Sequence, residues 1–220
     1  MSGAAALFVV FNGAMHSAST DTHNLASDTH ILAKAANKQL EMSERPWVYA
    51  SNWSLSEPLS FAEKGGKISI SAVLKNVGHS PAINARFDGR LISFSSTLEL
   101  HRLQVDYCHS LRDSLQKRPP ILGLGGDTIF PGEQRSIDQV IGMNTTEVAN
   151  GVKNDPIQGK ILPVLIGCVS YQFPFSSEYH QTGYTILLGH PQSGGWTEII
   201  PKGSPKGVTL LIPSMGEWAN

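Results

Sequence analysis

The chain alternates between polar and apolar side chains from Lys67 to Ala72, and this alternation limits the fold more than any other feature of the sequence. Every second residue is apolar as far as Leu74, and the apolar set consists of Ile68, Ile70, Ala72 and Leu74. A period of two is typical of a β-strand with one buried and one solvated face. Residues 76–82, NVGHSPA, interrupt the pattern with turn-forming residues before Ile83, Ala85 and Phe87 resume it. The sequence therefore predicts a corner between two half-buried strands that cover one core.

A long helix is expected before this β pattern, over residues 1–45. Residues 19–43 contain neither glycine nor proline, and DTHNLAS is followed directly by the near-repeat DTHILAK. A seven-residue period predicts the seam of a coiled coil, although a single helix packed on neighbours in an assembly fits equally well. The helix should end at Arg45, because a residue before proline is disfavoured in the helical region. His16, His23 and His30 share the seven-residue spacing, but steps of about 10.5 Å are too long for one metal ion, so we predict no metal site.

The first residues are apolar over too short a length to be classified from sequence. The run Ala4–Met15 has about a dozen residues, whereas a bilayer-spanning helix needs about 20. Three readings stay open: a signal-like segment, the outer part of a membrane anchor, and a helix buried against partner helices. We expect association with the cell membrane through this N-terminal helix. No basic cluster follows the run, which favours a body outside the cytoplasm, in the periplasm.

A second helix is expected as an insertion at about residues 96–118. Ser96 and Glu99 have the spacing of a capping box, and Pro119–Pro120 would stop the helix. Its apolar stripe is Leu100, Leu103, Tyr107, Cys108, Leu111 and Leu115. Capping-box spacing recurs between Asn144 and Glu147 and predicts a short helix near residues 144–153.

A strand buried on both faces is expected at Ile161–Tyr171, which is apolar at both parities. One parity holds Leu165, Val169 and Tyr171, and the other holds Leu162, Val164, Ile166 and Cys168. One set should face the core and the other the inserted helix. Cys108 would then lie near Cys168, and the pair is either two buried thiols or one disulfide.

Aromatic side chains supply the candidate binding residues. The hairpin after Tyr171 offers a patch for a protein partner: Phe173, Phe175, Tyr179 and Tyr184. The alternative is that these rings only stabilise the sheet through cross-strand pairs. A carbohydrate-binding platform would instead use Trp47, Trp53 or Trp196.

Three segments carry a resemblance to a known group of domains. Val73–Phe87 (VLKNVGHSPAINARF), Phe130–Ile137 (FPGEQRSI) and Gly167–Phe173 (GCVSYQF) resemble the immunoglobulin-like sandwich domains of bacterial envelope proteins, including CARDB-like adhesion-related domains. The junction Ser43–Val48 (SERPWV) is similar to that of uncharacterised bacterial proteins with a membrane helix ahead of such a sandwich. The resemblance implies a mainly β fold, with an antiparallel immunoglobulin-like β-sandwich over residues 46–220. It implies turn-forming roles for Asn76, Gly78, Pro81, Pro131 and Gly132, and no catalytic residue.

Composition and motifs argue against other classes of function. The formal net charge is -1 and only 16% of residues are charged, so no basic field is available to bind nucleic acid. Gly123–Thr128 lacks the lysine of a phosphate-binding loop, and His101 and His109 are eight residues apart without a catalytic motif. The sequence therefore predicts no enzyme and no cofactor. We expect a membrane-anchored binding or scaffold protein, or an accessory subunit of a membrane complex, that presents its sandwich to a protein partner or to another copy. The alternative is a module that binds a small ligand or a carbohydrate.

Overall fold

The chain divides into two units, Met1–Glu44 and Arg45–Asn220. The computed structural model describes residues 27–39, 43–94, 97–117, 126–154, 159–174, 176–192, 195–197, 199–211 and 218–219. In the first unit, residues 27–39 form a helix whose side chains are all exposed. The predicted helix is therefore seen in this part, while the coiled-coil positions before residue 27 lie outside the described residues.

The second unit is mainly β, as the sequence predicts. Its strands are β1 (Val48–Ala62), β2 (Gly65–Asn76), β3 (Ala82–Phe94), β4 (Asp127–Ile129), β5 (Gln134–Met143), β6 (Leu162–Gln172), β7 (Tyr179–Gln192), β8 (Gly195–Thr197), β9 (Thr209–Leu211) and β10 (Trp218–Ala219). Its helices are α2 (Thr97–Lys117) and α3 (Thr145–Asn154). Strands β1-β2-β5 form one sheet, and β10-β7-β6-β3-β4 form the other, with β8 and β9 also paired to β7.

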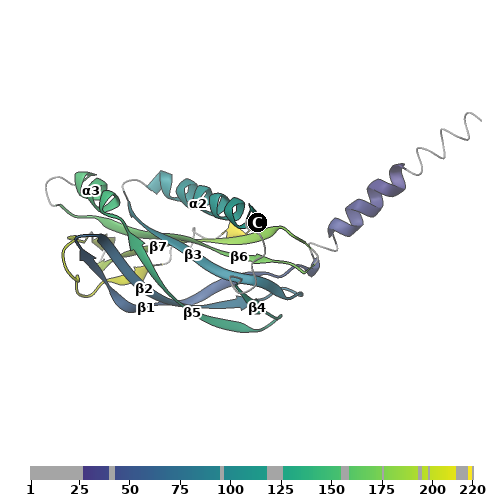
Figure 1. Ribbon diagram of the computed structural model, residues 1–220, viewed down its shortest axis with the longest axis horizontal. Helices are drawn as coiled ribbons and strands as arrows, with labels where there is room; N and C mark the ends of the chain where they lie inside the picture. The colour runs from purple at the N-terminus through teal and green to yellow at the C-terminus, as the bar shows by residue number, and fades with distance from the viewer. Residues whose placement is uncertain are drawn as a thin grey trace, which may run out of the picture. The chain divides into compact units, whose positions relative to one another are not determined.

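The two antiparallel sheets stack in a sandwich-like arrangement, with α2 along the outer side of the β7-β6-β3 sheet and α3 near one end (Figure 1). The predicted alternation in β2 is confirmed, because Ile68, Ile70 and Leu74 are buried while Lys67 is exposed. The short helix predicted from Asn144 is also confirmed. Asn144 Oδ1 accepts the N–H of Glu147 at 2.8 Å and caps α3.

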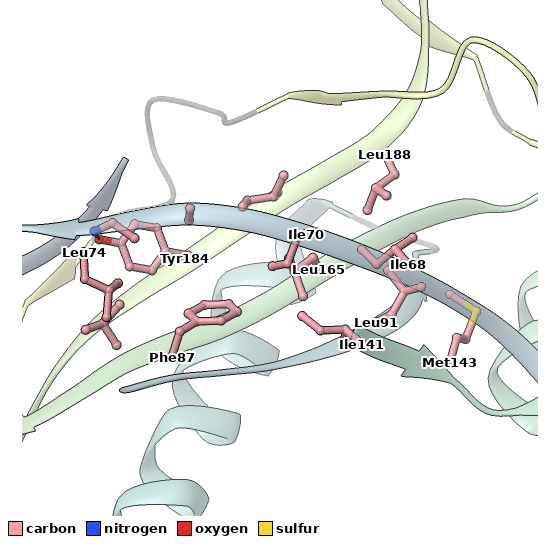
Figure 2. Packing of buried hydrophobic residues seen from close by; sticks show 14 of the residues in the cluster. Ile68, Ile70, Leu74, Phe87, Leu91, Ile141, Met143, Leu165, Tyr184 and Leu188 are labelled. Carbon is pink, nitrogen blue, oxygen red and sulfur yellow. Dashed lines mark hydrogen bonds between the residues drawn. The ribbon is translucent and has the colours of Figure 1, made fainter. Parts of the chain in front are cut away.

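Both sheets contribute to one hydrophobic core. Figure 2 shows Ile68 and Ile70 of β2, Ile141 of β5, Leu91 of β3 and Leu165 of β6 within this packing. Complete burial of such a side chain stabilises the fold by about 1.5–3 kcal/mol. The corner after β2 thus places two strands of different sheets over one core, as expected from the resumed alternation.

Strand β6 is buried on both faces, as its two apolar parities predict. Leu165 and Val169 belong to the core between the sheets. Val164 and Ile166 form a second cluster on the other face, where Tyr107 of α2 packs against them. The inserted helix therefore covers an apolar surface that β6 would otherwise expose.

The predicted stripe of α2 is wrong at one position. Leu103 is 39% exposed, and Gln104 is completely buried in its place. A helix turns about 100° per residue, so position 104 lies in line with the contacting residues Leu100 and Cys108, and position 103 lies to one side.

A disulfide joins Cys108 of α2 to Cys168 of β6, with 5.8 Å between the two Cα atoms. Of the two states left open by the sequence, the structure has the bridged one. Gln104 Nε2 lies 3.1 Å from Cys108 Sγ and donates to it. The bridge fixes the inserted helix covalently to the centre of the β7-β6-β3 sheet.

Candidate functional site

The aromatic residues predicted to form a binding patch do not assemble on the surface. Phe173 is 3% exposed and Tyr184 is fully buried. The hydroxyl of Tyr184 accepts the N–H of Ala50 from the opposite sheet, and its ring lies 5.3 Å from that of Trp53. Tyr179 is half-buried, and Phe175 lies outside the described residues. The prediction of an exposed patch is wrong for Phe173 and Tyr184, because Phe173 is buried just after β6 and the parity of β7 directs Tyr184 into the core.

The tryptophans do not offer an open stacking platform in the described part of the chain. Trp53 is half-buried and meets the ring of Phe87 edge-on at 5.1 Å. Trp47 is 36% exposed, but the Arg45 guanidinium lies 3.6 Å from its ring centroid and covers one face. The side chain of Trp196 lies outside the described residues.

Asn76 is the centre of a hydrogen-bond network at the corner after β2. Its side chain is completely buried. Oδ1 accepts the N–H of Trp47 at 3.2 Å and that of Gly78 at 2.9 Å. Nδ2 donates to the carbonyls of Ser80 at 2.8 Å and Ile129 at 2.9 Å. A carboxamide has two acceptor lone pairs and two N–H donors, so all four positions are used.

The backbone of Asn76 extends this network to the turn before β5. Its N–H donates to the carbonyl of Glu133 at 3.2 Å, and its carbonyl accepts the N–H of Gly132 at 2.9 Å. One residue therefore connects three segments: the start of the second unit, the corner between β2 and β3, and the β4–β5 turn.

Asn76 and Gly78 have the predicted place in the corner, and neither has a positive φ. A Cβ on Gly78 would lie 2.4 Å from the carbonyl oxygen of Arg45 and 2.5 Å from the nitrogen of Trp47. Glycine is required there because the backbone of the entering chain passes against it. The start of the second unit is thus built into the corner.

The β4–β5 turn follows the sequence prediction. Gly132 has a φ of 79°, and the N–H of Glu133 donates to the carbonyl of Phe130 at 2.9 Å. Proline at the second position and glycine with positive φ at the third are typical of a type II turn. Phe130 also donates its N–H to Glu133 Oε2 at 3.2 Å.

Three exposed apolar side chains belong to the segments that this network connects. The described residues of the second unit include six large apolar side chains that are exposed: Trp47, Val77, Leu103, Phe130, Val140 and Ile200. Trp47, Val77 and Phe130, which we call the junction pole, are 36%, 55% and 52% exposed. Val77 donates its N–H to the carbonyl of Trp47 at 2.8 Å, and Ile129, before Phe130, binds Asn76. Hydrogen bonds therefore connect the backbone segments that carry the junction pole, a set of exposed residues that sequence reasoning did not identify.

A shallow cleft of about 470 Å³ lies at the other end of β1, beside the start of α3. Lys64, Lys67, Arg90 and Glu147 line it, and Arg90 pairs with Glu147. Among the described residues, those of the cleft included, no three histidine, cysteine, aspartate or glutamate side chains converge as metal ligands. The charges of the cleft are carried by side chains at its rim.

A half-buried tyrosine, Tyr107, and a buried one, Tyr171, predict how stability depends on alkaline pH. Burial raises the pKa of Tyr107, against the outer face of β6, and that of Tyr171, in the core. Below a pH of about 10, the pKa of tyrosine in the unfolded chain, both the folded and the unfolded state keep these protons. The two groups therefore do not reduce the free energy of unfolding there. Above this pH the unfolded state loses protons first, and stability should fall by up to about 1.4 kcal/mol per pH unit for each group until the folded pKa is passed.

Urea unfolding at a series of alkaline pH values, with tyrosinate absorbance followed in parallel, measures this dependence. Tyr107→Phe should reduce its slope because one of the two groups is gone. A slope that stays the same in Tyr107→Phe would contradict the role of that hydroxyl.

Comparison with known proteins adds no relative to these observations. The sequence matches no protein-family model, no curated protein and no solved structure. Within the described residues, no helix has both the length and the apolar character needed to cross a bilayer.

Proposed function

We propose that the chain is a non-catalytic protein of the cell envelope that is tethered to a membrane through its N-terminal segment. Its second unit presents the junction pole to a protein partner, as a scaffold or as an accessory subunit of a membrane complex. The observation that carries this proposal is the position of the pole. Three exposed apolar side chains lie on the segments that meet at Asn76 where the second unit begins, and the hydrogen bonds of Asn76 connect their backbone.

The strand order supports an immunoglobulin-like identity for the sandwich. Strands β1-β2-β5 face β7-β6-β3-β4. In chain order this corresponds to strands A, B and E against G, F and C, with one further strand after C. The helix α2 is then an insertion after strand C. Many cell-surface domains share this sandwich architecture.

The disulfide supports a location of the second unit outside the cytoplasm. Disulfides persist in oxidising compartments such as the periplasm and are rare where thiols are kept reduced. Cys108 and Cys168 are both completely buried in the bridge between α2 and β6. The bridge therefore serves the structure, and its formation requires an oxidising environment while the chain folds.

A protein partner fits these surfaces better than a carbohydrate or another small ligand. Trp53 packs its ring on Phe87, and one face of Trp47 is covered by Arg45, so neither side chain is a ready platform for a sugar. The cleft beside α3 is shallow and lined at its rim by charged side chains. An exposed apolar surface of several side chains is typical of a protein interface.

Purification of the full chain from its native membrane in mild detergent tests the proposal. The double variant Val77→Asp with Phe130→Asp removes the apolar character of the junction pole. Val140→Asp is the matched control, because Val140 is 67% exposed and pairs with Ser69 along β5, away from the pole. We expect a stoichiometric partner to accompany the wild type and the control but not the double variant.

Two outcomes would overturn this function. One is recovery of the wild type without detergent as a soluble monomer with no companion. The other is a partner that remains bound to the double variant, provided that both variants unfold at the temperature of the wild type.

A further inference from the structure

We infer that the junction pole binds a second copy of the same chain, in a parallel assembly in which the helices of residues 27–39 also lie side by side. This inference rests on the proposed function and names the partner at the same site. It follows from the exposed apolar stripe of this helix, from the seven-residue repeat, and from the place where the chain enters the second unit.

The helix of residues 27–39 has an apolar stripe that is exposed among the described residues. Ile31 is 60% exposed and Leu32 is 69% exposed, and Ala35 and Ala36 follow one turn later and are exposed as well. An isolated helix of this length is only marginally stable in water. Its stability therefore has to come from packing of the stripe on another surface.

The seven-residue repeat selects a copy of the same helix as that surface. DTHNLAS and DTHILAK place Leu25 and Leu32 at equivalent positions. A seam with this period stays buried along its length against a helix with the same period. A second copy supplies that period by construction, and in a parallel pair like residues meet at the same level.

Parallel pairing also brings the two junction poles close together. Helices in such a pair lie about 8–10 Å apart. Residues 40–44 separate the described helix from Arg45, and a stretch this short reaches at most about 20 Å. The pole begins at Trp47, two residues further on. The short connection therefore limits how far the start of each pole can lie from the end of its helix.

This confinement decides whether a surface as small as the junction pole can act as an interface. A specific interface between free proteins buries about 1,200–2,000 Å², which three side chains do not supply. A tethered contact requires less area, because short linkers raise the effective concentration to the millimolar range. The pole is thus suited to a contact that strengthens an assembly already begun by the helices.

A lipid surface is the less favoured occupant. Residues 16–44 lie between the apolar run Ala4–Met15 and Arg45. The sequence predicts that they are helical, and a helix of that length spans about 44 Å. A helix of this length between the apolar run and the second unit favours a protein over lipid as the occupant of the pole.

Light scattering and sedimentation of the full chain in mild detergent test the assembly. We expect the wild type to form an oligomer. Leu32→Asp should give monomers, and Val77→Asp with Phe130→Asp should raise the dissociation constant at least tenfold. Val140→Asp should leave the constant unchanged. A monomeric wild type, or an oligomer as stable in the pole variant as in the control, would overturn the inference.

Crosslinking shows directly whether the two poles meet. Val77→Cys and Val140→Cys each add one exposed thiol to a chain whose own cysteines are bridged. A short bis-maleimide should link Val77→Cys into covalent dimers far faster than Val140→Cys. Equal rates would count against the pole as the contact.

The two proposals fail separately in these experiments. A monomeric chain that retains an unrelated partner through its junction pole contradicts the second copy but leaves the proposed function standing. If the pole variant stays oligomeric but loses binding to vesicles that contain anionic lipid, the pole contacts lipid, and the inference is wrong.

Discussion

Replacing Asn76 with alanine should destabilise the second unit by about 3–5 kcal/mol. The change removes the acceptor of two N–H groups, from Trp47 and Gly78, and the donor to two carbonyls. Each buried polar group left without a partner costs about 1–3 kcal/mol, and relaxation or entry of water recovers part of the sum. A loss of this size is a large share of the 5–15 kcal/mol that stabilises a typical domain. Urea unfolding of the wild type and the variant, followed by tryptophan fluorescence, measures the difference.

The variant Asn76→Asp tests the hydrogen bonds of Asn76 independently of the shape of its side chain. The carboxylate has nearly the same shape and keeps the acceptors, but it places negative charge against the carbonyls of Ser80 and Ile129. Burial and these carbonyls should raise the pKa of the new carboxyl, so stability should be recovered as pH falls and the protonated group donates one hydrogen bond. A cost below about 1 kcal/mol for Asn76→Ala would contradict the network, since that is the value of one ordinary hydrogen bond.

Removing the disulfide should cost about 4 kcal/mol of stability. The two cysteines are 60 residues apart, and a bridge that closes a loop of this length lowers the entropy of the unfolded chain by about that amount. For a domain of this size the unfolding temperature should drop by about 8–16 °C in a variant with both cysteines changed to alanine. Calorimetry of the oxidised, reduced and double-alanine forms measures the effect.

The location of the bridge adds a local prediction. α2 is held by Cys108 and by apolar contacts such as those of Tyr107 and Leu100. Without the bridge, the helix should open before the sheets do, and trypsin should cut at Arg102, Arg112 or Lys117 more rapidly. Unchanged cleavage at these sites, or equal unfolding temperatures with and without reductant, would show that packing alone holds α2.

Local periodicity explains what was predictable in the fold. The alternation in β2 predicted its buried face, and the two apolar parities of β6 divided its side chains into two sets on opposite faces, because a strand's side chains alternate by necessity. Which β6 set faces the core and which faces α2 became clear only from the structure. The helices were predictable from capping and spacing, with Leu103 as the exception.

Contacts distant in sequence explain what could not be predicted. Asn76 is 29 residues from Trp47 and 53 from Ile129, so its role depends on how the strands come together. Tyr184 was expected in an exposed aromatic patch of the hairpin, yet its register with β6 places it in the core. The junction pole combines residues from three separate segments and has no local signal.

Thiol trapping in intact cells of the native host tests whether the second unit folds around its bridge in an oxidising compartment. Cells are treated with an alkylating reagent before lysis, and the peptides of the protein are analysed by mass spectrometry without reduction. We predict one linked peptide pair that contains Cys108 and Cys168, with neither residue alkylated after mild denaturation. Recovery of both cysteines as alkylated, unlinked peptides would mean that α2 is not tied to β6 in the cell, and that the body does not lie where we place it.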